Sequence, residues 1–372
     1  MSEEKRLRVA VMFGGRSGEH EVSLQSARSV LAVLDPARYE ALQIGITHDG
    51  SWLVGGQVLH AMLDSATEGW ASGAILPVPS TNGLFRILPA QQGQRLELLS
   101  QIDVVFPVLH GTFGEDGTLQ GLLEMADLAY VGAGVLGSAL AMDKGVFQAV
   151  MRAHRIPVVE TQVFLRSQVQ SELEAVLSIA ETIAPYPLFV KPANLGSSVG
   201  ISKCSSRADL LEGVMEACRF DRRILVQRGV NAREIEVSVL GNDQPQASVP
   251  GEILPSREFY SYEAKYVDNA SGLLIPAPIP DATAELVRRL AVQAYQAIDC
   301  AGMARVDFLL DRDSGKLYLN EINTIPGFTQ ISMYAKLWEA SGLSYPDLVS
   351  RLIELALERK ADRDRIERRY QV

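Results

Sequence analysis

Cysteine is scarce in this chain of 372 residues. The three that occur, Cys204, Cys218 and Cys300, are scattered and form no CxxC pair. Their scarcity argues against a disulfide framework and a cysteine-based zinc site, since both need several thiols at suitable spacing. We therefore expect the three thiols to be packed in the interior of a protein of the reducing cytoplasm.

Long hydrophobic runs and an excess of positive charge are also missing. The first apolar run, residues 9–13, ends at two glycines, and no stretch approaches the roughly 18 apolar residues of a membrane-spanning helix. Lysine and arginine number 35 against 45 aspartates and glutamates, a formal net charge of −10. We therefore expect neither a membrane nor a nucleic acid as a partner.

The length of the chain predicts two or three domains, because a single core rarely serves so many residues. Residues 1–135 alternate strand and helix patterns, which predicts a doubly wound, Rossmann-like α/β domain. Residues 136–226 are interpreted as a smaller α+β domain and residues 227–372 as a third domain. Residues 256–276 lack periodicity, which favours a lid loop. No structure is assigned within residues 50–100.

The individual elements follow from apolar periodicity and from turn residues. Ser23 and Asp281 are expected to cap helices. The expected strands are 7–13, 39–47, 103–109, 189–191, 223–226 and 234–240, and the expected helices are 24–34, 142–154, 210–218, 281–298 and 346–359.

Two common site signatures are missing, the GxxxxGK[ST] phosphate loop and HExxH, and the loop at residues 14–23 lacks a clean GxGxxG. A weaker signal follows the strand that ends near Lys191, where the sequence reads KPANLGSSVG (191–200). Its glycines allow close backbone approach to a ligand, and the hydroxyls of Ser197 and Ser198 can bond phosphate oxygens. Taken alone, such a loop is more often a flexible hairpin tip.

A hairpin near the C-terminus carries the strongest signal. The apolar runs 305–310 and 319–323 are joined by a turn-rich segment, which predicts a β-hairpin. Side chains of a strand alternate between two faces, so Glu321 and Asn323 share one. Asp307 joins them only in one register of the hairpin.

That register depends on the turn. A regular hairpin that pairs Asp311 with Leu317 places Asp307 opposite Glu321, and a shift by one residue moves Asp307 to the other face. An odd-numbered loop or a bulge is needed for the favourable pairing. In that register, the polar side chains are expected to share their face with Leu309, Leu317 and Leu319.

Two adjacent carboxylates repel each other and are costly to bury without a counter-ion. Asp307, Glu321 and Asn323 offer the oxygen ligands that Mg²⁺ prefers, particularly when substrate phosphates complete its shell. Arg305 lies two residues before Asp307 on the same strand face, where it can hold a phosphate or a developing oxyanion. The hairpin therefore indicates phosphate chemistry.

Two loops of the first domain follow strands of one predicted sheet: residues 14–23 and residues 110–117. Ligands of open α/β sheets bind beyond the carboxyl ends of the strands, so both loops are expected to border one crevice. Glu19 in the first loop would repel phosphate and would bind an amine. His110 begins the second loop, although a lone histidine is more often structural.

Together these stretches resemble the D-alanine–D-alanine ligases of the ATP-grasp superfamily. The resemblance covers nearly the whole chain, and it is specific because of the combination rather than any single motif. The matching stretches are FGGRSGEHEVS (13–23), HGTFGEDGTLQG (110–121), MDK (142–144), VKPANLGSSVG (190–200), YEAKY (262–266), GMARVDF (302–308) and NEINTIPGFTQISMY (320–334).

The resemblance implies a three-domain ATP-grasp fold in which ATP is gripped between the central and C-terminal domains. It implies ligation of two D-alanines through a D-alanyl phosphate, with release of ADP and phosphate. The product would serve peptidoglycan synthesis, and hence the cell wall and cell shape. Two Mg²⁺ or Mn²⁺ ions, K⁺ as a candidate monovalent ion, and a cytoplasmic homodimer are further implications.

The resemblance also assigns roles to residues. Gln227, Arg228 and Val230 would lie at the adenine hinge, and Glu234 at the ribose. The complete ATP-binding set is Lys144, Lys191, Ser197, Ser198, Gln227, Arg228, Val230, Glu234, Lys265, Asn320 and Glu321. The metal set is Asp307, Glu321 and Asn323, and the substrate set is Glu19, His110, Gly327, Ser332 and Met333.

The implied catalytic set is Glu19, Ser197, Tyr266, Arg305 and Ser332. Glu19 would hold the ammonium of the first D-alanine and form a hydrogen-bonded triad with Ser197 and Tyr266. Ser332 and Met333 would bind the carboxylate of the second D-alanine. Arg305 and the backbone of Gly327 would stabilise the oxyanion.

Two alternatives stay open. A depsipeptide ligase would join D-alanine to D-lactate, but such relatives typically replace the lid tyrosine, and Tyr266 is present. A non-catalytic nucleotide sensor would require a broken site. The residues needed for an intact one are present at Lys144, Lys191, Asp307, Glu321 and Asn323.

Overall fold

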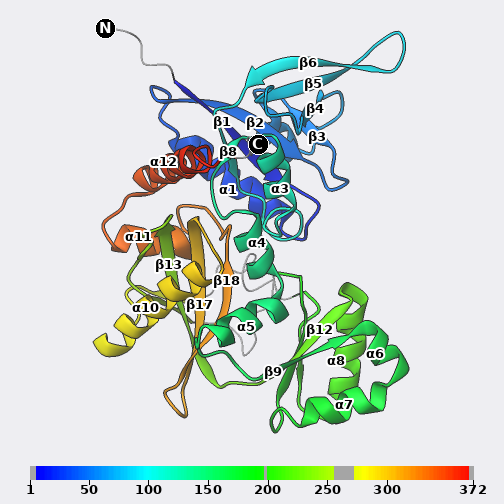
Figure 1. Ribbon diagram of the computed structural model, residues 1–372, viewed down its shortest axis with the longest axis vertical. Coiled ribbons are helices and arrows are strands. Elements are labelled where there is room, and N and C mark those ends of the chain that lie inside the picture. The colour runs from blue at the N-terminus through cyan, green and yellow to red at the C-terminus, as the bar shows by residue number, and fades with distance from the viewer. Residues whose placement is uncertain (1–5, 197–198, 255–271, 368–372) are drawn as a thin grey trace.

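The computed structural model describes residues 6–196, 199–254 and 272–367. The strands of these ranges form sheets of eight, four and six strands. Figure 1 shows the largest sheet at one end of the molecule and the two smaller ones side by side at the other. In the ranges described, no helix has both the length and the apolar character needed to cross a membrane.

The N-terminal sheet has the order β6-β5-β4-β3-β2-β1-β7-β8. Its parallel half consists of β1 (Leu7–Gly14), β2 (Tyr39–Ile46), β7 (Val104–Pro107) and β8 (Ala129–Tyr130). The antiparallel half consists of β3 (Trp52–Val54), β4 (Ser72–Ile75), β5 (Gly83–Pro89) and β6 (Gln94–Gln101). The antiparallel half occupies the region to which no structure was assigned from the sequence. The sequence carries no strand signal for β6, because β6 is exposed along most of its length and shows no apolar alternation.

Three helices, α1 (His20–Val33), α2 (Val58–Leu63) and α3 (Thr118–Met125), accompany this sheet. Since α1 begins at His20, the prediction that Ser23 is its N-cap is wrong. Ser23 is fully buried, and its hydroxyl accepts a hydrogen bond from the Gly14 amide and donates one to the Val108 carbonyl. The side chain therefore ties α1 to the ends of β1 and β7.

The central sheet is antiparallel in the order β11-β10-β12-β9. Three helices lie in this unit: α6 (Arg166–Ser171), α7 (Leu173–Glu181) and α8 (Arg207–Phe220). Its strands are β9 (Thr161–Leu165), β10 (Leu188–Pro192), β11 (Ser202–Cys204) and β12 (Arg223–Arg228). Alternate residues of β10 and β12, such as Val190 and Val226, enter its core with Leu210 of α8.

The C-terminal sheet has the order β16-β15-β13-β17-β18, and β14 pairs with β13. Its strands are β13 (Ala232–Gly241), β14 (Gln246–Ala247), β15 (Gly251–Leu254), β16 (Gly272–Leu274), β17 (Gly302–Asp311) and β18 (Leu317–Asn323). The helix α10 (Asp281–Ala297) buries Leu290 and Ala294 as predicted, but its N-cap is Pro280, so the predicted cap at Asp281 is wrong. Two further helices are α11 (Met333–Ala340) and α12 (Tyr345–Arg363).

Several elements connect the three sheets. The helices α4 (Val135–Met142) and α5 (Lys144–Ala153) lie beside the C-terminal sheet, where Phe147 and Met151 share a core with Phe308. The last helix, α12, returns to the N-terminal sheet, and Arg359 donates to the carbonyls of Gly132 and Tyr130. The largest core cluster accordingly contains residues from both ends of the chain.

The sheets fall close to the predicted domains 1–135, 136–226 and 227–372, which we retain as a proposed division. One boundary needs adjustment, because β12 ends at Arg228. We propose to place the junction between the central and C-terminal domains after Arg228.

Gly302 offers a test of the contact between the first domain and β17. Its φ is +71°, and a Cβ there would lie 2.9 Å from the backbone nitrogen of Gly132. We expect Gly302→Ala to lower the free energy of unfolding by about 2–4 kcal/mol, through backbone strain and steric overlap together. Gly315→Ala is the control, since φ is +67° there but nothing lies within 4 Å of the added Cβ. Urea denaturation measures the free energy of unfolding of both variants. An equal loss in the two would show that the close approach of Gly302 to Gly132 does not limit the side chain at this position.

Candidate active site

The hairpin of β17 and β18 pairs Asp307 with Glu321, as predicted. The regular register, which would have paired Asp311 with Leu317, does not occur, because Leu317 pairs with Leu310. A bulge between Asp307 and Phe308 shifts the register, and Asn320 is the additional residue. The bulge was one of the two arrangements that the sequence required for Asp307 and Glu321 to face each other.

The bulge also changes which side chains share a face. Leu317 and Leu319 are buried in a core cluster with Phe308, so the prediction that they share the face of Glu321 is wrong. Asn320 and Glu321 are consecutive, yet both remain partly exposed. A regular strand would have turned one of them inward, so the bulge adds a polar side chain to the open side.

Arg305 lies at the centre of this polar surface. Its Nε and Nη2 donate to the two carboxylate oxygens of Asp307, each at 2.7 Å, and Glu236 Oε2 lies 3.0 Å from the same Nε. Asn323 Nδ2 donates to Asp307 Oδ2 at 2.9 Å. Burial by itself would lower the pKa of Arg305, but Asp307 and Glu236 raise it well above its usual range. The guanidinium is therefore a fixed positive charge.

Lys144 supplies a second positive charge. Its Nζ donates to the Leu195 carbonyl at 2.7 Å and lies 3.9 Å from Glu321 Oε2. It begins α5, whose N-cap Asp143 accepts hydrogen bonds from the amides of Gly145 and Val146. Lys144 thus connects the glycine- and serine-rich loop of the central domain to the acidic strand β18.

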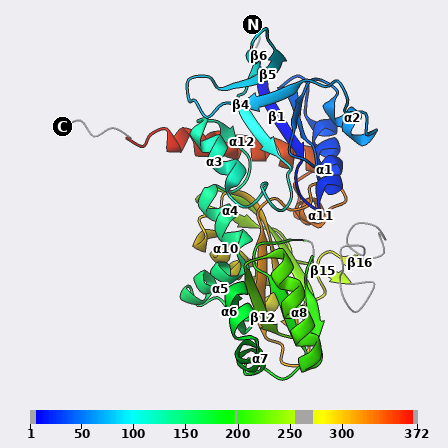
Figure 2. The ribbon, with the colours of Figure 1, turned by 90° about the vertical axis from the view of Figure 1, so that its right-hand side faces the viewer.

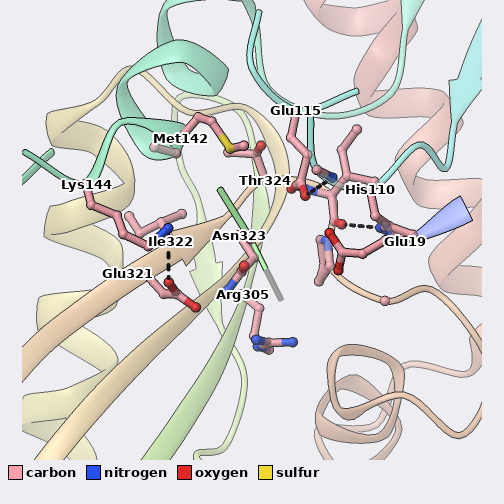
Figure 3. A pocket seen from close by; sticks show the side chains of 16 residues that line it. Glu19, His110, Glu115, Met142, Lys144, Arg305, Glu321, Ile322, Asn323 and Thr324 are labelled. Atoms are coloured by element: carbon pink, nitrogen blue, oxygen red, sulfur yellow. Dashed lines mark hydrogen bonds and ion pairs between the residues drawn. The ribbon is translucent and has the colours of Figure 1, made fainter. Parts of the chain in front are cut away.

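Glu19 approaches the pocket from the first domain. It precedes α1, and its Oε2 lies 2.9 Å from where a Cβ on Gly111 would stand and 3.2 Å from the equivalent point on Gly196. A side chain at either glycine would crowd the carboxylate. In Figure 3, Glu19 and His110 lie on one side of the pocket, and Lys144 and Glu321 lie on the other.

His110 joins the first domain to the loop after β18. Its Nδ1 lies 2.8 Å from the Ile325 carbonyl and its Nε2 lies 3.0 Å from Ser26 Oγ, which accepts from the Phe328 amide. Facing a carbonyl, Nδ1 must carry the proton, so Nε2 accepts from the serine. Burial lowers the pKa of His110, so the ring is neutral at pH 7. Both ring nitrogens serve protein contacts, and a substrate-binding role for His110 stays a prediction.

Glu115 fastens the same loop. Its carboxylate accepts hydrogen bonds from the amides of Gly111 at 2.8 Å and Ile325 at 3.0 Å. Burial, and then the charge of Glu19, raise its pKa to about 8 against the opposing effect of these two amides. Both backbone polar groups of Ile325 are therefore held by side chains of the first domain.

These groups surround one pocket at the junction of the three domains. The predicted residues that line it are Glu19, His110, Lys144, Arg305, Glu321, Asn323 and Gly327. Asp307 contacts two of them, Arg305 and Asn323. Other lining residues include Gly111, Glu115, Met142, Gly196, Ile322, Thr324 and Pro326.

The predicted adenine contacts lie at the end of β12 and in the connection to β13. Gln227 is buried in β12, and its Nε2 donates to Thr161 Oγ1 at 3.2 Å. Arg228 bonds Glu160 at 2.7 Å and stacks over Tyr318. Val230 follows in the connection to β13. Three residues predicted to contact other parts of ATP are Lys191 on β10, Glu234 on β13 and Asn320 on β18. None of these residues lines the pocket described above.

Ser332 and Met333 lie where α11 begins. Ser332 is the N-cap, and its Oγ is 2.7 Å from Thr329 Oγ1 and 3.5 Å from the point where a Cβ on Gly327 would stand. The helix N-terminus with its unsatisfied amides suits a carboxylate. Four predicted site residues, Ser197, Ser198, Lys265 and Tyr266, lie outside the described residues, as does most of the predicted lid 256–276.

Two acidic residues of the site were missed from the sequence. Glu115 stands in the loop 110–117, which was expected to border the crevice, but no role was assigned to this residue. Glu236 alternates with Ile235 and Val237 along β13, so a period-two pattern placed it on the face opposite the core. The sequence signal that could have identified Glu236 is a charged residue inside a strand that is otherwise largely apolar.

The residues fit a divalent cation. Asp307, Glu321 and Asn323 are oxygen-bearing and adjacent, and with Nδ2 of Asn323 committed to Asp307, its Oδ1 is the atom suited to a cation. The carboxylate of Asp307, however, is bound by Arg305 on both oxygens. A cation at Asp307 therefore requires a change in this ion pair.

Comparison with known proteins gives consistent matches. The family described as D-ala D-ala ligase N-terminus matches residues 8–133, and the one described as D-ala D-ala ligase C-terminus matches residues 150–354. The D-alanine--D-alanine ligase of Natranaerobius thermophilus is 48% identical over 362 residues, which is 97% of this chain and 98% of that protein. The one from Heliobacterium modesticaldum is 49% identical over 96% of both chains.

Solved structures of two ligases are similar to this chain in both sequence and fold. The D-alanine-D-alanine ligase from Coxiella burnetii is 35% identical with a TM-score of 0.81, covering 97% of both chains. The VanG D-Ala:D-Ser ligase from Enterococcus faecalis is 34% identical with a TM-score of 0.83, covering 95% of this chain and 100% of that one.

The raised pKa of Glu115 predicts a pH-dependent stability. A carboxyl whose pKa is raised in the folded state contributes stability below its ordinary pKa of 4.5, and this is lost as the pH rises toward about 8. We expect the free energy of unfolding of Glu115→Gln to vary less between pH 5 and 8 than that of the wild type. The difference should be roughly 1–3 kcal/mol, since part of the side chain faces the pocket.

Asp116→Asn is the control, because it removes the neighbouring carboxylate of the same turn. Urea denaturation at several pH values measures the effect. A pH slope in Glu115→Gln equal to that of the wild type would contradict the assignment.

Proposed function

Since the chain belongs to the D-alanine–D-alanine ligase family, we propose that it joins two D-alanines at the expense of ATP, releasing ADP and phosphate. One observation supports this most strongly. Arg305, Lys144, Asp307, Glu321 and Glu19 come from three domains and border or support one pocket. Such a site can hold an anionic nucleotide and an amino acid at the same time.

The first D-alanine is assigned to the side of the pocket where Glu19 lies. Its carboxylate would attract the ammonium group. The second D-alanine is assigned to the start of α11, where Ser332 and the amide of Met333 would bind its carboxylate. The pocket between Glu19 and Gly327 would bring the two substrates together.

The reaction requires activation of a carboxylate, because its oxygen is a poor leaving group. Transfer of the γ-phosphoryl group to the first D-alanine gives an acyl phosphate, and the amine of the second attacks its carbonyl carbon. Arg305 and the backbone amide of Gly327 would stabilise the oxyanion that this attack creates. Water must be excluded while the acyl phosphate exists, and the lid 256–276 with Tyr266 is assigned to this task.

Two divalent ions would be held by Asp307, Glu321 and Asn323, and we propose Mg²⁺ or Mn²⁺. Such ions neutralise charge on the transferring phosphoryl group. Lys144 and Lys191, with Ser197 and Ser198, would bind the phosphates.

The adenine is assigned to the hinge of Gln227, Arg228 and Val230, and the ribose to Glu234. The remaining nucleotide contacts are assigned to Lys265 and Asn320. We further propose a cytoplasmic homodimer that serves peptidoglycan synthesis, with K⁺ as a candidate activator. Neither a nucleic acid nor a membrane is proposed as a partner.

Phosphate release in the presence of ATP and Mg²⁺ tests the function directly. The panel contains D-alanine, L-alanine, D-serine and D-lactate, each alone and paired with D-alanine. We expect release with D-alanine alone, accompanied by one D-alanyl-D-alanine per phosphate. Release that requires L-alanine, or phosphate release without dipeptide, would contradict the proposal.

Tyr266 offers a test of amine over hydroxyl selection. We expect Tyr266→Phe to increase the ratio of D-lactate to D-alanine incorporated at the second position, most clearly at low pH, where the amine is protonated. Competition between the two substrates measures this ratio, and Tyr262→Phe in the same stretch is the control. An unchanged ratio would remove the role given to Tyr266.

A further inference from the structure

Besides Asp307, Arg305 contacts a second buried carboxylate, which has no direct role in the proposed ligation. Glu236 of β13 is 4% exposed, pairs in register with Asp307, and does not line the pocket. Its Oε2 lies 3.0 Å from Arg305 Nε. We propose that Glu236 is a positioning residue that retains Arg305 when Asp307 binds a divalent cation. This inference rests on the proposed function.

The reason is a competition for Asp307. Both of its oxygens accept from Arg305, and Oδ2 also accepts from Asn323. A guanidinium in this position repels a dication and occupies lone pairs that the cation needs. Cation binding at Asp307 therefore requires Arg305 to weaken or release this bidentate contact.

Releasing Arg305 has a cost of its own. A guanidinium that leaves its carboxylate inside a protein is a buried, uncompensated charge. Glu236 lowers this cost, because its Oε2 already lies 3.0 Å from Nε and can accept the Nε–H when Asp307 releases it. When Glu236 holds Nε, Arg305 can direct its two terminal nitrogens toward anionic oxygens in the pocket.

The surroundings distinguish the two carboxylates. β13 lies between β15 and β17, so Glu236 is on an inner strand with paired backbone on both sides. Its side chain is 6% exposed against 13% for Asp307. Glu236 is consequently the fixed partner, and Asp307 is the one whose contacts can change.

A second buried pair in the same sheet provides a matched control. Glu252 of β15 is 3% exposed and accepts two hydrogen bonds from Arg233, at 2.7 and 2.6 Å. Neither residue lines the pocket. Glu252→Gln removes a buried charge from an arginine pair, as Glu236→Gln does, but away from the pocket lining.

The experiment measures Mn²⁺ binding by electron paramagnetic resonance with saturating ADP, whose phosphates complete the metal shell. We expect Glu236→Gln to weaken Mn²⁺ binding about 10- to 100-fold, as loss of a partner behind a metal ligand does elsewhere. Glu252→Gln should stay within about twofold of the wild type while losing similar thermal stability. Glu236→Asp, which keeps the charge, should recover part of the affinity and serves if Glu236→Gln does not fold.

A double-mutant cycle tests whether the effect passes through Arg305. In an Arg305→Met background the competition for Asp307 is gone, so Glu236→Gln should change Mn²⁺ affinity by less than about twofold. Equal affinities of Glu236→Gln and Glu252→Gln, or additive effects in the cycle, would overturn the inference. A wild type that binds no Mn²⁺ and releases no phosphate with D-alanine would instead overturn the proposed function.

Discussion

The site depends on the need to balance several carboxylates that meet at one surface. Glu236, Asp307 and Glu321 lie on three neighbouring strands, and Arg305 and Lys144 supply positive charge among them. Carboxylates this close remain ionised only with cations beside them. This requirement links the fold to the chemistry, because the strands bring the acids together and a charged ligand completes the balance.

The first domain is joined to this surface through Ile325. His110 and Glu115 hold its carbonyl and its amide, and Ser26 extends the contact to the Phe328 amide. These polar groups are buried, so any separation of the domains would expose or orphan them. The helix α12 adds ion pairs from Arg363 to Glu124 and Asp127. The side of the pocket that carries Glu19 is thereby held in place relative to the side that carries Glu321.

Much of the fold could be predicted from the sequence where elements are long and periodic. The parallel strands β1, β2 and β7 and the helix α8 agree with the expected ranges within a few residues. Short strands in residues 52–101 could not be assigned, because β6 is exposed and has no apolar alternation. The cap predicted at Ser23 was wrong, because its hydroxyl bonds the Gly14 amide and the Val108 carbonyl across the fold. The cap predicted at Asp281 was wrong by one residue, because Pro280 is the N-cap.

For the site, the sequence by itself determined the chemistry. The oxygen-bearing side chains of Asp307, Glu321 and Asn323, with Arg305 two residues before Asp307 and Lys191 near the end of a strand, indicate a metal and a phosphate. Only the tertiary structure decided the register, since the bulge at Asn320 changes the strand face without changing composition. Only it revealed Glu236 and Glu115, because the significance of a buried carboxylate lies in its partners, and Arg305 and Ile325 are distant in the sequence.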